Sequence, residues 1–451
     1  MDKLSVRETA EALGVSVSFD DDILSVSTDT RTIEKGSLFV CIAGENFDGH
    51  TFAQAALEKG AVAVLSERDL GLDRQIVTNG TREALLRLSG YYRNKFPITV
   101  AGVTGSVGKT TVKEMTCDVL SQKYKTLKTE GNLNNEIGLP KTLFRLDGTY
   151  EAAVIEMGMN HSGEIARLTR AASPTLSIIG NIGISHIENL GSRENILKAK
   201  LEITEGMKPD APLILNGDDE LLYNAKVTDR PVYYYGIRNK YCRFKAYDIE
   251  NLGDKSAFTV DFGCGEQRVE LPAPGIHNIY NALAAFTAGF LVSVDPEQAA
   301  RALSRYVPSG MRQRFRTVKD ICFIEDCYNA SPDSVKAAIN TLSGVNASRR
   351  IAVLGDMLEL GEMSEEAHRK SGRIAGEAGI DILYTYGERS ELTAETAIKS
   401  GVKAVRSFNS KSELADALKD ILKENDAVLF KASRGMKLEE VINSIYEELE
   451  A

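Results

Sequence analysis

The sequence lacks the features that define several large classes of protein. Its six cysteines form no C-x-x-C pair, and their spacing suits no zinc site. Scattered single thiols are typical of a reducing compartment. No apolar run approaches the ~18 residues that cross a bilayer, and the opening MDKLSVRETAEALG indicates an amphipathic helix without the apolar segment of a signal peptide. We therefore expect a soluble, cytoplasmic protein that does not insert into a membrane.

A basic surface is also missing. The chain carries 54 Lys and Arg against 64 Asp and Glu, which gives a formal net charge of −10. Proteins that bind nucleic acid or anionic membranes without specificity present a basic face, so we expect neither partner. A nucleotide ligand remains compatible with this charge, because a phosphate site needs only a few cations and backbone N–H groups.

The arrangement of apolar runs predicts an α/β protein of three domains. The length of 451 residues divided by about 150 residues per domain gives three. Short β-branched runs such as ITVAGV (98–103) alternate with helix-compatible stretches, which favours doubly wound parallel sheets. We expect a small N-terminal α/β domain at 1–95, a central domain with a mostly parallel sheet at 96–308, and a Rossmann-like α/β domain at 309–451.

The segment TGSVGKTT (104–111) is the strongest motif in the sequence. It follows a predicted buried strand and precedes a predicted helix, which is the context of a P-loop. In such a loop backbone N–H groups face phosphate oxygens, Lys109 reaches the β- and γ-phosphates, and the Thr110 hydroxyl binds Mg²⁺. The pattern departs from G-x-x-x-x-G-K-[ST], because Val103 stands where the first glycine is expected. The alternative is an ordinary glycine turn.

Other candidate residues have a structural alternative beside each functional one. Glu156 ends the predicted strand in VIEMG, where a carboxylate faces the ligand crevice and can bind Mg²⁺ or form a strand-end salt bridge. Asn278 and Asn281 begin the helix HNIYNALAA, where they can bind an adenine edge or cap the helix. Arg312 follows the second linker and suits charge stabilisation at ATP phosphates, but Arg314 and Arg316 stand close to it.

The succession of motifs resembles one enzyme family. The P-loop T-G-x-x-G-K-T after a buried strand resembles the Mur ligases and the folylpolyglutamate synthetases. Over about residues 28–440 the motifs follow the order of the Mur ligases, and within them of the branch that adds D-alanyl-D-alanine: EGNLNNEIGLP (130–140), VIEMGMNHSGEI (154–165), NIGISHIENLGS (181–192), AKLEI (199–203), HNIYNALAA (277–285), DCYNASPDS (326–334), LGDMLELGEMS (354–364) and KASRGM (431–436).

The resemblance implies an ATP-dependent amide ligase that joins two substrates, UDP-MurNAc-tripeptide and D-Ala-D-Ala. ATP phosphorylates the C-terminal carboxylate of the tripeptide, and the amine of D-Ala-D-Ala attacks the acyl phosphate. The implied cofactors are ATP, two Mg²⁺ ions and a carbamylated lysine at Lys200, whose carbamate oxygens would orient Mg²⁺. From its pattern alone, Lys200 is a solvated helix lysine. We expect a monomer.

The resemblance also implies a role for each candidate residue. The catalytic residues are Lys109, Lys200, Arg312 and His186, and the metal ligands are Thr110, Glu156, His186 and Lys200. The ATP-binding residues are Gly105, Ser106, Val107, Gly108, Lys109, Thr110, Thr111, Asn278, Asn281, Arg312, Asp326 and Asn329. The residues implied to bind the precursor or the dipeptide are Thr28, Asp29, Arg31, Asn46, Asp48, His50, Asn134, Asn160, His161, Tyr328, Asp356, Lys431, Ser433 and Arg434.

Three other functions remain open at this point. The chain can be a sibling ligase that adds L-Ala, D-Glu or the third residue, or an enzyme of the folylpolyglutamate type. The combination of NASPDS, LGDMLELGE and SRGM argues against both. The third alternative is a P-loop NTPase that switches between partners and turns over nucleotide without an amine substrate. The sequence leaves open whether the third peptide residue of the precursor is lysine or meso-diaminopimelate.

Overall fold

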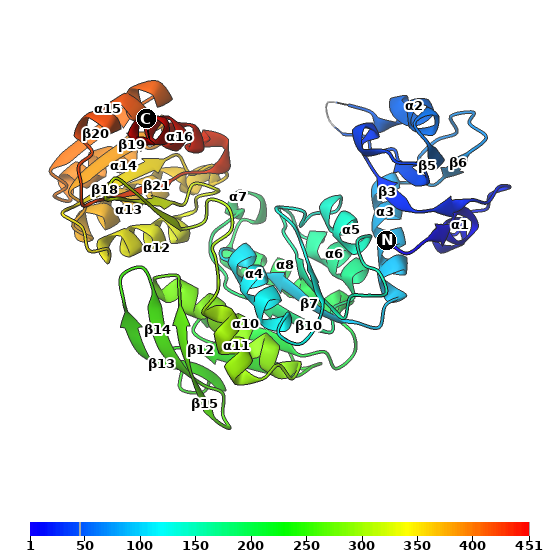
Figure 1. Ribbon diagram of the computed structural model, residues 1–451, viewed down its shortest axis with the longest axis horizontal. Coiled ribbons are helices and arrows are strands. Elements are labelled where there is room, and N and C mark those ends of the chain that lie inside the picture. The colour runs from blue at the N-terminus through cyan, green and yellow to red at the C-terminus, as the bar shows by residue number, and fades with distance from the viewer. Residues whose placement is uncertain (45–46, 451) are drawn as a thin grey trace.

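The computed structural model describes residues 1–44 and 47–450 and contains three α/β units in chain order (Figure 1). The central unit lies between the other two, with the N-terminal unit on one side and the C-terminal unit on the other. Each unit is built around its own sheet, and the sheets have four, nine and six strands. The expected α/β fold with three domains is therefore confirmed.

The N-terminal unit is a four-stranded parallel sheet in the order β3-β4-β5-β6. A two-stranded ribbon and helix α1 precede it, and Ser5 and Glu8 cap that helix reciprocally. The elements are β1 (Leu4–Ser5), α1 (Val6–Leu13), β2 (Asp22–Ile23), β3 (Ser25–Ser27), β4 (Ser37–Val40), α2 (Ala53–Glu58), β5 (Ala61–Ser66), β6 (Gln75–Val77) and α3 (Thr81–Asn94).

The central sheet has the order β15-β14-β13-β12-β11-β10-β7-β9-β8. Its strands are parallel from β8 to β13, and two antiparallel strands extend the β13 edge. Its strands are β7 (Thr99–Thr104), β8 (Thr126–Lys128), β9 (Ala152–Glu156), β10 (Leu176–Ile179), β11 (Leu213–Asn216), β12 (Val232–Gly236), β13 (Phe244–Asn251), β14 (Ser256–Asp261) and β15 (Glu266–Leu271). Its helices are α4 (Lys109–Leu120), α5 (Gly138–Leu143), α6 (Glu164–Ala172), α7 (Ile187–Leu190), α8 (Arg193–Leu201), α9 (Glu220–Tyr223), α10 (Ile276–Leu291) and α11 (Pro296–Leu303).

Two apolar clusters cover the two faces of this sheet. Helices α4, α10 and α11 contribute to the cluster on one face, and α6 contributes to the cluster on the other. The second cluster also contains α3 and residues of the N-terminal sheet. At the joint, the fully buried Arg93 of α3 donates to Ala172 O at 2.6 Å and to Phe96 O at 2.9 Å. The first two units therefore share a continuous core.

The C-terminal sheet has the order β16-β17-β21-β18-β19-β20 and is parallel except for β16. Its strands are β16 (Arg314–Val318), β17 (Ile321–Glu325), β18 (Arg349–Gly355), β19 (Ile382–Tyr386), β20 (Ala404–Phe408) and β21 (Asp426–Lys431). Its helices are α12 (Pro332–Ser343), α13 (Ser364–Glu377), α14 (Glu391–Lys399), α15 (Lys411–Ile421) and α16 (Glu439–Glu450). No helix in the described part of the chain is long and apolar enough to cross a membrane.

Candidate active site

A cavity of about 1000 Å³ lies where the central and C-terminal units meet. Its central wall comes from the P-loop, the loops after β9 and β10 and the start of α10. Its other wall comes from the loops after β17 and β18 and from the helices α12 and α13. Ligands of open α/β sheets bind at the carboxyl ends of parallel strands, and here two such edges face the same space.

The P-loop residues Ser106 to Thr111 line this cavity, and the loop ends in helix α4. Gly108 has a φ of +80°, and a Cβ there would lie 2.8 Å from Asn281 Oδ1. Both the backbone conformation and the close contact therefore favour glycine at this position. Lys109 Nζ donates to Gly105 O at 3.0 Å, which places the ammonium over the loop. Desolvation in the cleft lowers the pKa of Lys109; Glu156 opposes this shift and Arg312 adds to it.

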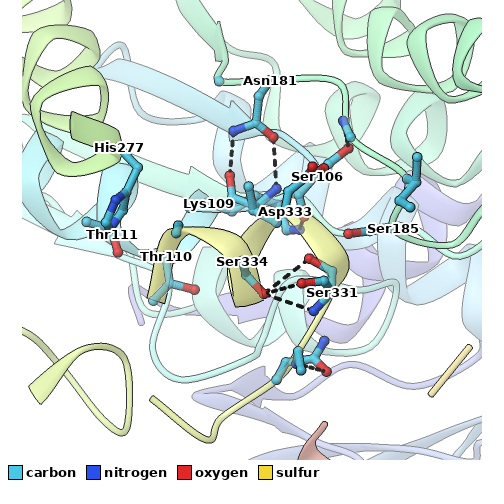
Figure 2. A pocket seen from close by; sticks show the side chains of 18 of the residues that line it. Ser106, Lys109, Thr110, Thr111, Asn181, Ser185, His277, Ser331, Asp333 and Ser334 are labelled. Atoms are coloured by element: carbon cyan, nitrogen blue, oxygen red, sulfur yellow. Dashed lines mark hydrogen bonds between the residues drawn. The ribbon is translucent and has the colours of Figure 1, made fainter. Parts of the chain in front are cut away.

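Asn181, which we did not predict, fixes the P-loop. Its Nδ2 donates to Val107 O at 2.9 Å, its Oδ1 accepts from Val107 N at 3.0 Å, and its backbone O accepts from Ser106 N at 3.1 Å (Figure 2). Gly183 N in turn donates to Ser106 Oγ at 2.9 Å. The signal in the sequence was the polar NIG after a buried strand, at the edge where the P-loop was expected.

Glu156 ends β9 and is 2 % exposed. Its Oε1 accepts from Asn134 Nδ2 at 2.8 Å, whereas its buried Oε2 has no hydrogen-bond partner in the described chain. The nearest cation to Oε2 is the fully buried Lys113 at 3.9 Å. One carboxylate oxygen at the P-loop therefore remains open to a ligand.

Burial lowers the pKa of both His186 and Lys200. His186 has a left-handed backbone with a φ of +62°, and its Nδ1 is 3.3 Å from Glu359 Oε2 of the C-terminal unit. Burial, followed by Lys109 and Lys200, lowers the pKa of His186 to about 4. Lys200 is 2 % exposed, and burial, followed by the charge of Lys109, lowers its pKa well below the ordinary value.

The donor atoms at this wall fit a magnesium ion that is completed by phosphate and water. Mg²⁺ prefers oxygen ligands and usually binds through one or two protein groups. Thr110 and the free Oε2 of Glu156 supply such oxygens. Within residues 1–44 and 47–450 there is no group of three or more His, Cys, Asp or Glu that could hold a metal without further ligands.

Asn278 and Asn281 reach the cavity, but their amides are engaged with protein. Asn278 Nδ2 donates to Pro274 O and to Gln313 Oε1, both at 2.9 Å. Asn281 Nδ2 donates to Asn278 Oδ1 at 3.3 Å. Capping of α10 by Asn278 is not found, because the N-cap is Gly275. Their contact with adenine stays a prediction.

The C-terminal wall brings together Arg312, Asp326, Tyr328, Asn329 and Lys431. The Arg312 guanidinium lies 4.0 Å from the centre of the Tyr328 ring. Lys431 Nζ is 2.9 Å from Asp326 Oδ2 and donates to Asn329 O at 2.9 Å. These groups line the cavity opposite the P-loop. The predicted contacts of Arg312, Asp326 and Asn329 with ATP, and of Tyr328 and Lys431 with substrate, stay predictions.

Three predicted dipeptide residues do not line the cavity. Arg434 pairs with Glu439 at 2.7 Å, and its guanidinium lies 5.9 Å from the Tyr328 ring. The Asp356 carboxylate accepts from Ser390 N and Ser390 Oγ at 2.7 Å, so it fixes a turn between strands. Ser433 Oγ accepts from Leu358 N at 2.9 Å. A role for these side chains in binding the dipeptide stays a prediction.

The precursor residues fall into separate places. Asn134 and Asn160 line the cavity, whereas His161 is exposed beside Glu164. In the N-terminal unit Arg31 binds Asp29, and these hydrogen bonds lower the pKa of Asp29 to about 2. Thr28 adjoins this pair, which lies outside the cavity lining.

A second polar group of the N-terminal unit is built on Asp48. Its Oδ1 accepts from His50 Nδ1 at 2.6 Å, and its Oδ2 accepts from Arg68 at 2.6 Å. Arg68 and His50 hold the pKa of Asp48 well below its usual range. No hydrogen bond or ion pair joins this group to Asp29 within the described residues. Asn46 lies outside the described residues.

Comparison with known proteins identifies the family. Family models match in chain order: the Mur ligase family catalytic domain over 22–99, the Mur ligase middle domain over 103–289, and the Mur ligase glutamate ligase domain over 312–434. The chain belongs to the Mur ligase family.

Its relatives share one name. UDP-N-acetylmuramoyl-tripeptide–D-alanyl-D-alanine ligase of Bacillus subtilis is 40% identical, with 99% of each chain covered. The Escherichia coli enzyme of the same name is 37% identical, covering 97% of this chain and 96% of its own. The structure of MurF from Acinetobacter baumannii has a TM-score of 0.92 at 29% identity, with 99% of each chain covered. MurF of Thermotoga maritima in complex with ADP has a TM-score of 0.86 at 28% identity, covering 95% of this chain and 98% of that one.

Proposed function

We propose that this chain joins D-alanyl-D-alanine to the C-terminal carboxylate of UDP-MurNAc-tripeptide at the expense of ATP. The product is the UDP-MurNAc-pentapeptide used in peptidoglycan synthesis. The proposal rests on the cavity shared by two units. In this cavity the P-loop of the central unit faces Arg312, Asp326 and Lys431 of the C-terminal unit. The relatives that match over nearly the whole chain carry this activity in their names.

The chain's own groups suit an acyl-phosphate reaction. The tripeptide carboxylate attacks the γ-phosphorus of ATP, the bond to ADP breaks, and the dipeptide amine then displaces phosphate from the acyl carbon. Lys109 and Arg312 place fixed positive charge on either side of the transferring group. Because the two walls belong to different units, their approach brings acid, ATP and amine together.

Thr110, Glu156 and His186 are the residues that would hold Mg²⁺. The ions supply charge neutralisation for the phosphoryl and carboxylate oxygens. Glu156 offers a free, buried oxygen, and His186 is a neutral imidazole because its pKa is lowered by burial. We propose two ions, the second of them at His186 and Lys200.

Lys200 is the site we propose for carbamylation. Lys200 is 2 % exposed, burial lowers the pKa of its amine, and the neutral form of an amine is the one that attacks CO₂. The carbamate would replace an amine with an oxygen pair of the kind that Mg²⁺ binds. Activity should fall in CO₂-depleted buffer and return with bicarbonate, and the wild-type activity of a Lys200→Ala variant would contradict the assignment.

The N-terminal unit is the proposed site for the UDP end of the precursor. Thr28, Asp29 and Arg31 follow one strand of its sheet, and Asp48 and His50 follow the next. Asn134 and Asn160 line the cavity where the peptide end would arrive. We further propose that the enzyme acts as a monomer in the cytoplasm, where ATP and UDP-linked precursors are found.

One assay tests the function directly. ADP formation is measured with the purified precursor and ATP across single amino acids and dipeptides. We expect D-Ala-D-Ala to stimulate ADP formation and single D-alanine to be a poor substrate. Stimulation by a single L-Ala, D-Glu or diamino acid would replace the proposal with a sibling ligase. ADP release that no amine stimulates would instead indicate a nucleotide-driven switch.

A further inference from the structure

Gln313 lies at the junction of the central and C-terminal units, directly after Arg312 and one residue before β16. Its φ is +51°, a left-handed conformation that few residues other than glycine adopt. Such backbone outliers persist only where the surroundings hold them. The contacts of the Gln313 side chain show what holds this one.

The carboxamide of Gln313 joins helices of two units. Its Oε1 accepts from His277 Nε2 at 2.8 Å and from Asn278 Nδ2 at 2.9 Å, both at the start of α10. Its Nε2 donates to Thr341 Oγ1 at 3.2 Å, in the last turn of α12. One side chain thus connects the helix behind the nucleotide loop to a helix of the C-terminal unit.

The polar connection continues in both directions. On the central side, Asn281 Nδ2 donates to Asn278 Oδ1 at 3.3 Å, and Asn281 packs directly against Gly108 of the P-loop. On the C-terminal side, the Thr341 hydroxyl donates to Ala337 O at 3.0 Å. A continuous chain of contacts therefore runs from the P-loop to α12.

Helix α12 meets the central unit at both of its ends. Its first turn carries Asp333, whose Oδ2 would lie 2.4 Å from a Cβ added to Gly183. Figure 2 shows Asp333 near Ser106, and both side chains lie close to Gly183. Its last turn is the one that Gln313 binds. In Figure 1 this helix lies on the side of the C-terminal unit that faces the central unit. With both ends fixed, its position relative to the P-loop is set.

We propose that Gln313 is an interdomain positioning residue. It docks α12 against α10 and so holds the C-terminal wall of the cavity, where we expect the amine to bind, opposite the P-loop. The kinetic part of the proposal rests on the function proposed above. Amide formation needs the amine within about 3–3.5 Å of the acyl carbon, so a small rotation of α12 separates the reactants. Gln313 acts through the helices that it joins.

Two variants break the connection at different points. Gln313→Leu removes both arms of the carboxamide, and leucine is unbranched at Cβ, as glutamine is. Thr341→Val removes only the hydroxyl and keeps the size of the side chain. Gln122→Leu is the matched control, because this exposed glutamine makes one local hydrogen bond, to Asp118 O at 3.2 Å, and lies outside the cavity lining.

The first measurement is independent of the reaction. Fluorophores are attached through unnatural amino acids at position 301 in α11 and position 398 in α14, both exposed. With MgADP bound, we expect a narrow distribution of label distances in the wild type and in the control. Gln313→Leu and Thr341→Val should both broaden it. A distribution of label distances that is unchanged in both variants would overturn the proposal. If Gln313→Leu does not fold, the distribution in Thr341→Val alone tests the proposal.

The second measurement separates positioning from nucleotide binding. Losing one hydrogen bond typically changes an equilibrium about 2- to 10-fold, so KM for D-Ala-D-Ala should rise by that factor in Thr341→Val and by at least that factor in Gln313→Leu, which loses the bonds to His277, Asn278 and Thr341. The Kd for ADP should change less than about twofold, and the double variant should resemble the worse single variant because both break one connection. A loss of ADP affinity equal to the rise in KM would instead make Gln313 an adenine ligand. If D-Ala-D-Ala does not stimulate ADP formation by the wild type, the proposed function is wrong. The measurement of label distances still tests the role of Gln313 in that case.

Discussion

Gly108→Ala tests whether the left-handed turn of the P-loop is what allows nucleotide to bind. A left-handed conformation costs an L-residue about 1–2 kcal/mol. The new Cβ would also stand 2.8 Å from Asn281 Oδ1 at a φ of +80°, and Asn281 is 9 % exposed and bound to Asn278. Pushing that side chain off its rotamer adds about 0.5–1.5 kcal/mol. The sum is about 1.5–3.5 kcal/mol.

This free-energy cost should lower the affinity for ADP, because the P-loop of the variant can relax into another conformation when it is free but not when it holds ADP. At about 1.4 kcal/mol for each factor of ten, we expect ADP affinity to fall roughly 10- to 300-fold. Titration calorimetry with MgADP measures the change, and thermal unfolding checks that the variant is folded.

Gly71→Ala is the matched control for this experiment. Gly71 has a similar φ of +69°, has nothing within 4 Å of an added Cβ, and lies in the N-terminal unit away from the cavity. It should lose a comparable amount of backbone free energy and keep its ADP affinity. ADP binding as tight in Gly108→Ala as in the wild type would refute the argument for the loop.

The remaining predictions concern single charged residues. Lys109→Ala should abolish ADP formation in a folded protein, because Lys109 stabilises charge on the transferring phosphate; turnover at the wild-type rate would remove the P-loop assignment. Lys200→Ala should be nearly inactive and partly rescued by a short-chain carboxylate that refills the oxygen site, which a titration with acetate measures. If Arg434 leaves Glu439 to clamp the dipeptide carboxylate, Arg434→Ala should weaken binding of D-Ala-D-Ala by about 2–5 kcal/mol. KM for D-Ala-D-Ala should then rise, and KM for ATP should stay unchanged. Equal shifts in both KM values would mean that Arg434 only braces the C-terminal unit.

The sequence predicted the parallel parts of the fold well, for a physical reason. Strands buried on both faces, such as β7 and β9, are continuous apolar runs, and they alternate with helices of clear period. The antiparallel strands β13 to β15 were not predicted. They lie at one edge of the sheet, and β13 and β15 carry many exposed polar residues, so the local pattern of these two strands resembles loops. The shared core of the first two units was missed as well, because it depends on contacts of α3 over long sequence distances.

The candidate site divides in the same way. Residues of a local backbone motif, such as Gly108 and Lys109, could be placed at the cavity from the sequence alone. Asn181 and Gln313 could not, because each acts through partners far away in the sequence, at Val107 and at Thr341. Asp356 has a partner that the sequence did not indicate. Its carboxylate accepts hydrogen bonds from Ser390, which lies far away in the sequence, and its role in binding the dipeptide stays a prediction.

The three arginines after the second linker show how strand geometry resolves what spacing leaves open. Arg314 and Arg316 lie two residues apart in β16, so their side chains share one face of the strand. Arg314 approaches Glu325 at 3.7 Å, and Arg316 lies over the Tyr446 ring at 4.1 Å. Arg312 precedes the strand, stacks on Tyr328 and lines the cavity. Because the strand pairs with β17, Arg314 and Arg316 are held away from the P-loop. Of the three, Arg312 is therefore the one that lines the cavity, and its contact with ATP stays a prediction.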